Sequence, residues 1–336
     1  MKNRIVWISL LLAWLMAFSS QSEVKAADYG DGDFKDYMSE FIIHHVMDEY
    51  KWHIGGSWYL YLPFIAYNHT NRSLDVFSTR HLFSGPYKGY EMYHGKITRP
   101  DGARFFDISI TKNVLALFIS AIAIILIFTS VARAYKRRDD MVPRGFQSFI
   151  EPVILFVRDE IVTPSIGQKQ SDRFAPYILT LFFFILFNNL LGLIPFFPGG
   201  TNLSGNIAFT MTLAVFTLVT ILVSGNKHYY QHIFWPPGVP APLKIPIAAI
   251  EFFGIFTKPF ALMIRLFANI TAGHIIILSI VSIIFVFRSF AVGASISLLL
   301  IFMSVIEMLV AVLQAYIFTM LSAIFIGQAV EEPEHH

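Results

Sequence analysis

Three ionisable residues stand inside long apolar stretches in the C-terminal third of this 336-residue chain: Arg265, His274 and Glu307. An arginine keeps its proton at any working pH, whereas a histidine titrates near neutral pH and a nearby carboxylate can exchange a proton with it. A charged group inside a membrane costs about 3 kcal/mol on insertion scales and more in simulations. Three such groups therefore indicate a function, and their types favour proton transfer with an electrostatic role for the arginine.

The spacing of the polar residues places them on defined faces of a helix. Glu251, Lys258 and Arg265 are seven residues apart, so a helix brings them nearly into line. Asn269 lies one turn beyond Arg265 on nearly the same face. His274 follows Arg265 by nine residues, about 900° of rotation, and so points to the opposite face. One face thus carries a permanent cation and the other a titratable imidazole.

A second apolar segment carries Glu307 and Gln314, which are seven residues apart and share a face. The midpoint between His274 and Glu307 is 290.5, and the midpoint between Arg265 and Gln314 is 289.5. Both midpoints fall inside the sequence "FRSFAVG". An antiparallel hairpin that turns there would bring the members of each pair to about the same depth.

Structural roles compete with these interpretations. A lone arginine can extend to the lipid headgroups, but Arg265 is roughly twenty residues from either end of its segment, which is too far. His274 and Glu307 could form a purely structural pair, and Glu251 near the end of its segment could be solvated. For Lys258 a structural and a functional role are equally supported. No acid shares the arginine face at the same depth, so we expect a partner chain to supply it.

The composition is that of a polytopic membrane protein. The chain is 55% hydrophobic and only 14% charged, whereas a soluble domain has roughly 25% charged residues. The absence of cysteine excludes disulfides, thiolate metal sites and a cysteine nucleophile. No nucleophile–base set, phosphate-binding loop or dinucleotide motif is present, so we expect no catalytic activity, no cofactor and no nucleic-acid partner.

The N-terminal sequence predicts a signal peptide and a domain outside the cytoplasmic membrane. Residues 1–26 have a basic start, a short apolar region and a cleavage-like end. Residues 27–110 are polar and aromatic, and "WYLYLPFIAY" and "RFFDISI" predict strands, with a turn at Pro100-Asp101-Gly102. Six of the eleven histidines lie here, at spacings that match no metal-ligand pattern.

Residues 111–336 form the predicted membrane domain, with the mature N-terminus in the periplasm and the C-terminus in the cytoplasm. Basic residues after the first span belong in the cytoplasm. Residues 146–161 predict an amphipathic helix on the cytoplasmic face, broken by Pro152. The fold is therefore an all-α polytopic membrane protein with a small β-containing segment outside. The five expected membrane crossings are residues 114–132, 175–197, 207–224, 246–286 and 295–329.

The last two crossings are longer than a membrane is thick. Some 35 to 40 residues make about 55 Å of helix, against about 30 Å of hydrocarbon. We therefore expect a strongly tilted or bent helical hairpin, with Pro259 as one site for a kink. Long tilted helices suit a surface that wraps around something cylindrical.

The sequence "MIRLFANITAGH", with "LQAYIF" downstream and "NNLLGLIP" in the second span, resembles subunit a of the rotary F-type ATP synthases. The resemblance covers about residues 112 to 332. It departs from the family pattern at Ala268, where glycine is common, and at Gly192, where some members carry aspartate. The residues before the first span are longer than the usual N-terminus of the family, and the resemblance gives them no role.

The resemblance implies that Arg265 faces a carboxylate of the c-subunit ring and that His274 and Glu307 form the outer half-channel, exchanged relative to many bacterial members. It further implies that Asn269 and Gln314 are polar residues beside the arginine. Glu251 is then expected near the cytoplasmic half-channel. The implied partners are the c-ring, the b-subunit peripheral stalk, the other ATP synthase subunits and membrane lipid. The second span contributes one more polar residue to the expected set, Asn189.

The expected function is proton translocation through two offset half-channels in the bacterial inner membrane, which drives rotation and ATP synthesis elsewhere in the complex. Two alternatives stay open, a stand-alone ion channel or secondary transporter and a polytopic membrane enzyme. The sequence leaves open whether protons or sodium ions move, and how many subunits the ring has.

Overall fold

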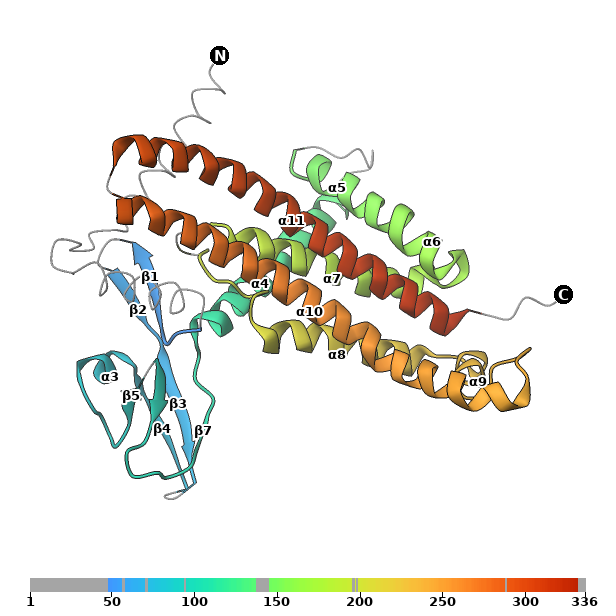
Figure 1. The fold of residues 1–336 in the computed structure, drawn as a ribbon, viewed down its shortest axis with the longest axis horizontal. Coiled ribbons are helices and arrows are strands. Elements are labelled where there is room, and N and C mark those ends of the chain that lie inside the picture. Colours follow the sequence, from blue (N-terminus) through green and yellow to red (C-terminus); the bar gives the residue numbers. More distant parts are fainter. Residues whose placement is uncertain are drawn as a thin grey trace, which may run out of the picture. The chain divides into compact units, whose positions relative to one another are not determined.

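A computed structural model gives the fold (Figure 1). The predicted signal peptide (residues 1–26) and the start of the predicted periplasmic domain (residues 27–110, here called the outer domain) lie outside the described residues. The chain forms two compact units. The first unit comprises Met1–Ile119, Leu191–Leu203 and Gly273–Val305. The second unit comprises Ser120–Leu190, Ser204–Ala272 and Ile306–His336. The structure describes residues 48–55, 58–69, 72–93, 95–136, 145–194, 197, 199–287 and 289–331.

The outer domain, in the first unit, consists of short antiparallel strands and one helical turn. Both sequences that predict strands do contain them, and the Pro100–Gly102 turn lies between two strands, with Gly102 at a left-handed φ of 67°. The sheets are β1-β2, β4-β3-β7 and β5-β6. The elements are β1 Lys51–Gly55, β2 Trp58–Tyr61, β3 Pro63–Asn68, β4 Ser73–Ser78, α3 Arg80–Ser84, β5 Glu91–Tyr93, β6 Lys96–Thr98 and β7 Phe105–Asp107.

Aromatic side chains form the core of this domain. Phe64 and Tyr90 are fully buried, and their ring centroids lie 5.1 Å apart. The Tyr90 hydroxyl donates a hydrogen bond to Asp75 Oδ2 at 2.7 Å. Burial, and then this bond to a carboxylate, raise the pKa of Tyr90 to about 12. Leu82 on α3 and Ile97 on β6 complete the cluster, so the core lies on one face of the β4-β3-β7 sheet.

Among the residues that the structure describes, five helices are long and apolar enough to cross a membrane, as the sequence predicts. The second helix differs in its bounds, because it begins at Gln168 in polar sequence and ends at Gly192 before a glycine- and proline-rich loop. A helix can extend beyond its apolar part wherever water or protein satisfies the extra turns. The five are α4 Lys112–Lys136, α7 Gln168–Gly192, α8 Ile207–Ser224, α10 Ala241–Phe287 and α11 Phe290–Val330.

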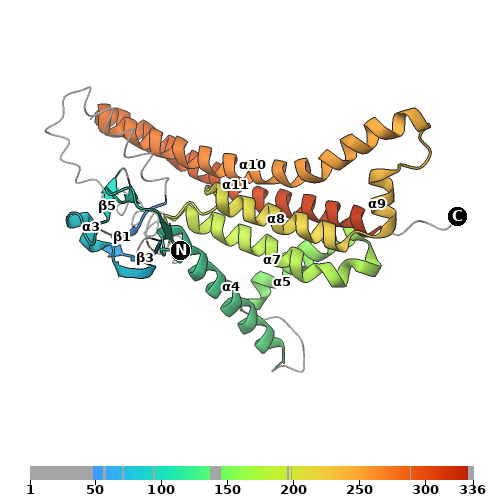
Figure 2. The same cartoon turned by 90° about the horizontal axis from the view of Figure 1, so that it is seen from below.

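The last two helices form the long hairpin, but its turn is shorter than expected. The sequence "FRSFAVG" is mostly helical, and only residues 288–289 separate α10 from α11. The N–H of Gly293 donates to the Ser289 carbonyl at 2.8 Å, so α11 is hydrogen-bonded from its start. The turn is therefore centred near 288.5, slightly before both predicted midpoints. Figure 2 shows that α10, which contains Pro246 and Pro259, is bent rather than straight.

The predicted amphipathic helix is not broken at Pro152. Instead α5 (Gln147–Phe156) runs through Pro152, a π-helix η1 (Val157–Val162) follows, and α6 (Thr163–Ile166) ends the segment. A proline removes one backbone donor, but the turns on either side can still hold a helix together. The predicted break at Pro152 is therefore wrong, and the helix becomes irregular only five residues later, at Val157.

The second unit has one continuous apolar core. Residues of the α5–α6 segment are buried in it together with side chains from α7, α10 and α11. Its fully buried members include Ile161, Ile178, Leu266 and Ile326. This core holds the middle of α10 against α7 and α11, and so fixes which face of α10 is left exposed.

Candidate functional site

Arg265 lies on the exposed face of α10. Its neighbours Leu262, Met263 and Leu266 are buried in the protein, whereas Arg265 and Asn269 are exposed. No described residue forms an ion pair or hydrogen bond with the Arg265 guanidinium. The core contacts thus orient a permanent cation away from the chain itself, as the sequence predicts for a group that meets an acid of a partner.

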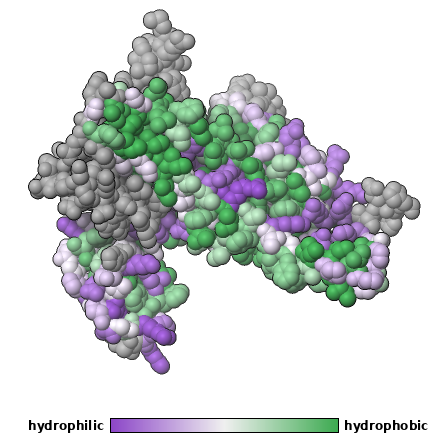
Figure 3. All heavy atoms as spheres, viewed as in Figure 1, coloured by the Kyte–Doolittle hydropathy of each residue, from purple (hydrophilic) through white to green (hydrophobic). Residues whose placement is uncertain are grey.

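Small side chains surround this arginine. Ala261, Ala268 and Ala272 are exposed on the same face, four residues before, three after and seven after Arg265. Small residues let another helix approach closely in a membrane. Figure 3 shows hydrophilic residues gathered within the apolar surface over α10 and α11.

Gln314 and Asn189 are both buried, at 4% and 3% exposure. No hydrogen bond joins Gln314 to Arg265 in the described part of the chain. Asn189 on α7 donates from Nδ2 to the Ala311 carbonyl of α11 at 3.0 Å, and its Oδ1 accepts from the Ser204 hydroxyl at 2.5 Å. Asn189 therefore connects α7, α11 and the start of the α8 region, and this supports a structural role beside the predicted one.

Glu307 and His274 stand on neighbouring helices of the hairpin. The Glu307 side chain is buried at 8% exposure and His274 is half-buried. His274 belongs to the first unit and Glu307 to the second. Their pairing at one depth stays a prediction.

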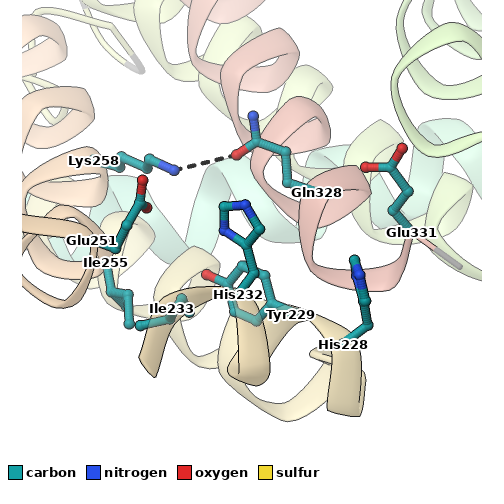
Figure 4. A pocket seen from close by; sticks show the side chains of 9 residues that line it. All are labelled: His228, Tyr229, His232, Ile233, Glu251, Ile255, Lys258, Gln328 and Glu331. Carbon is teal, nitrogen blue, oxygen red and sulfur yellow. Dashed lines mark hydrogen bonds between the residues drawn. The ribbon is translucent and has the colours of Figure 1, made fainter. Parts of the chain in front are cut away.

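A polar pocket of about 320 Å³ lies among the N-terminal part of α10, the C-terminal end of α11, and the short helix α9 (Lys227–Phe234) (Figure 4). Glu251 and Lys258, two of the predicted site residues, line it together. The Lys258 ammonium donates to Gln328 Oε1 at 3.2 Å and lies 5.3 Å from the centre of the Phe325 ring. The pocket thus brings an acid, a cation and an amide to one end of the second unit.

The sequence interpretation missed the contribution of α9 to this pocket. His228 and His232 are four residues apart, so they share a face of α9, and both line the cavity. Their spacing was a usable signal, but nothing in the sequence tied α9 to Glu251. Tyr229 lies between them, and burial, followed by Tyr230 and Glu251, raises its pKa.

Asn226 fixes α9 to the end of α11. Its side chain accepts from the Tyr229 N–H at 2.7 Å and caps the helix. Its backbone N–H donates to the Ala329 carbonyl at 2.9 Å, and its Nδ2 donates to the Glu331 carbonyl. The loop after α8 and the C-terminal end of α11 therefore lie at the same end of the second unit.

Within the described residues, no group of His, Asp or Glu side chains could hold a metal ion. Of the six histidines in residues 27–110, the structure describes His53, His69 and His81. His44, His45 and His94 lie outside the described residues.

The five apolar helices and the polar groups along α10 and α11 define a multi-pass membrane protein with an exposed cation on its longest helix. Residues 114–327 match the family described as ATP synthase A chain. The chain belongs to that family, the subunit a of F-type ATP synthases. Residues 41–114 match a second family, described as a domain of unknown function (DUF8433).

Curated relatives agree. The chain is 44% identical over 238 residues to ATP synthase subunit a 2 of Chlorobaculum tepidum, a match covering 69% of this chain and 66% of the relative. It is 38% identical over 308 residues to ATP synthase subunit a of an Anaeromyxobacter species, covering 88% of this chain and 71% of the relative. The chain spans about two thirds of the length of the relatives it matches. The family match and the five apolar helices together make it a component of an ATP synthase complex and a multi-pass bacterial membrane protein.

Proposed function

We propose that this chain is the static proton channel of its ATP synthase, with two half-channels that meet a ring of c subunits at Arg265. The observation that carries the proposal is the exposed Arg265 guanidinium. It is surrounded by alanines and forms no ion pair with an acidic side chain among the described residues. A c-subunit carboxylate that passes this face would find its counter-charge there. The chain itself catalyses no reaction. Each proton that crosses contributes about 2.3 kcal/mol per 100 mV.

The polar pocket supports a cytoplasmic half-channel. It is lined by Glu251, Lys258 and the α9 histidines, all of which can exchange protons or order water. Its residues on α10 lie about two to four helical turns from the arginine, since Lys258 precedes Arg265 by seven residues and Glu251 by fourteen. A proton released from the ring beside Arg265 would leave through this pocket.

The contacts of the loops support the proposed orientation. The ring of Trp52 in the outer domain lies 5.0 Å from the ring of Phe197, in the loop after α7. The loop after α8 is bound to the C-terminal end of α11 through Asn226. We therefore place the outer domain (residues 27–110, after removal of a signal peptide 1–26) outside the cytoplasmic membrane. The membrane domain (residues 111–336) then ends in the cytoplasm.

We expect His274 and Glu307 to act as a pair in the outer half-channel. The double exchange H274E/E307H should retain at least tenfold more ATP-driven proton pumping than His274→Ala or Glu307→Ala alone, because it keeps both groups. The measurement is acidification of inverted membrane vesicles, normalised to the amount of assembled complex. Equal losses in all three variants would contradict the pair.

A stand-alone ion channel is the second candidate, and reconstitution separates the two. We expect this chain to co-purify with small two-helix subunits, and its liposomes to show no proton conductance above empty liposomes when it is reconstituted alone. Conductance by the chain alone that Arg265→Ala leaves unchanged would overturn the proposal in favour of a channel.

A further inference from the structure

The three-stranded sheet of the outer domain presents an apolar face to its surroundings. Antiparallel pairing places Leu74, Tyr67 and Phe106 in one row across β4, β3 and β7. These side chains are 59%, 37% and 63% exposed. They alternate with side chains that enter the core, as expected of a pleated strand. We call this outward side of β4-β3-β7 the outer sheet face.

A second apolar row lies beside the first. Val76 pairs with Ile65, and the N–H of Ile108 donates to the Ile65 carbonyl at 2.8 Å. Val76 and Ile108 are both more than half exposed. The opposite side of the same sheet packs on Phe64, Tyr90 and Leu82 in the domain core. An antiparallel sheet of this kind normally has a polar outer side, so a sheet that is apolar on both sides marks an interaction surface.

One end of the outer sheet face carries two arginines and a histidine. His69 follows Tyr67 by two residues and is paired with Arg104, whose carbonyl accepts from the His69 N–H at 3.4 Å. Arg72 lies on the other side of His69, two residues before Leu74. All three side chains are exposed. Apolar and aromatic residues bordered by cations are typical of surfaces that rest on phosphate headgroups.

The chain keeps this face close to the membrane. Ile108 precedes Lys112, the first residue of α4, by four residues, so their Cα atoms are at most about 14 Å apart. The start of α4 is itself bound to the domain. The Lys112 N–H donates to the Glu49 carbonyl at 2.8 Å, and the Asn113 N–H donates to Asp48 Oδ1 at 3.0 Å.

We propose that the outer sheet face rests on the outer leaflet of the membrane, with its two apolar rows among the upper acyl chains and its arginines on lipid phosphates. Tyr67 is suited to this depth because its ring is apolar and its hydroxyl can stay in contact with water, while Phe106 adds apolar area. The domain is then a membrane-bound platform beside the first span. This inference rests on the membrane crossing of α4 and on the proposed placement of the domain outside the cytoplasmic membrane, and not on proton translocation.

The chain contains no cysteine, so single cysteines can report depth in the full-length protein. We would label Phe106→Cys and Leu74→Cys with bimane, reconstitute each in phosphatidylcholine–phosphatidylglycerol vesicles, and add lipids with a doxyl group high on the acyl chain. Ser84→Cys is the control. Ser84 is exposed on α3, whose Leu82 packs into the core on the opposite side of the sheet.

We expect at least threefold more quenching by doxyl lipid at positions 106 and 74 than at position 84. The double variant R72E/R104E should reduce that quenching in anionic vesicles. Equal quenching at all three positions would overturn the proposal. A label at position 106 that neither doxyl lipid nor aqueous iodide quenches would overturn it too, because protein would then cover the face.

Discussion

Replacement of Arg265 by alanine should reduce ATP-driven proton pumping at least 100-fold. At an effective dielectric constant near 20, a cation about 4 Å from a carboxylate stabilises its ionised form by about 4 kcal/mol. That energy corresponds to about a thousandfold change in the equilibrium between the charged and neutral acid. Without the arginine, a ring carboxylate facing α10 would keep its proton and carry it from one half-channel to the other without coupling.

The measurement is acidification of inverted vesicles that contain the whole complex, with immunoblots to show equal assembly. The matched control is Arg158→Ala, because Arg158 is an exposed arginine on η1 whose guanidinium pairs with the neighbouring Asp159. Arg158→Ala should pump at the native rate. Native pumping by an assembled Arg265→Ala complex would refute the role proposed for the arginine.

Replacement of Gly327 by alanine should destabilise the helical part by about 3 kcal/mol, at the upper end of the cost of overpacking. Gly327 is where α11 meets the backbone of α6. A methyl group there would overlap the Ser165 carbonyl oxygen and lie 2.9 Å from its carbon. Because both contacts are backbone, neither helix can yield by rotating a side chain.

Gly254 is the matched control, since it is also a helical glycine but a methyl group there would meet no atom within 4 Å. Gly254→Ala should be neutral or slightly stabilising, because alanine favours a helix over glycine. The two variants would be compared by their midpoints of thermal unfolding in detergent and by the yield of assembled complex. Equal midpoints for the two would show that α11 and α6 do not pack as described.

The sequence predicts the long helices well because each is a continuous apolar segment. In a membrane, only a helix buries such a segment and satisfies its backbone hydrogen bonds at the same time. The hairpin turn was harder to place, since "FRSFAVG" has the polar residues of a loop and yet forms helix after Ser289. Pro152 misleads for the opposite reason: its missing donor suggests a break, whereas the flanking turns and the buried Ile150 hold the helix.

The candidate site was predictable only where one helix carries it. The line from Glu251 through Lys258 to Arg265 follows from helical spacing alone. The pocket does not, because it needs α9 and the end of α11 to come together. Asn226 makes that contact with backbone carbonyls of Ala329 and Glu331, which no sequence pattern reveals. The outer sheet face was missed because its rows depend on the register of three strands.

The π-helix η1 lets one short segment bury more apolar surface than an α-helix could. Val157, Ile161 and Val162 are all fully buried. In an α-helix, Val162 would be rotated about 140° from Val157 and would leave the core. The wider turn aligns residues five apart, and the Thr163 hydroxyl bonds the Arg158 carbonyl at 2.9 Å. Such a turn holds one extra residue. Deleting the residue between Arg158 and Glu160 would therefore restore an α-helix and still leave α5 facing the core, because Val157 and Val162 would then be four residues apart and share a face.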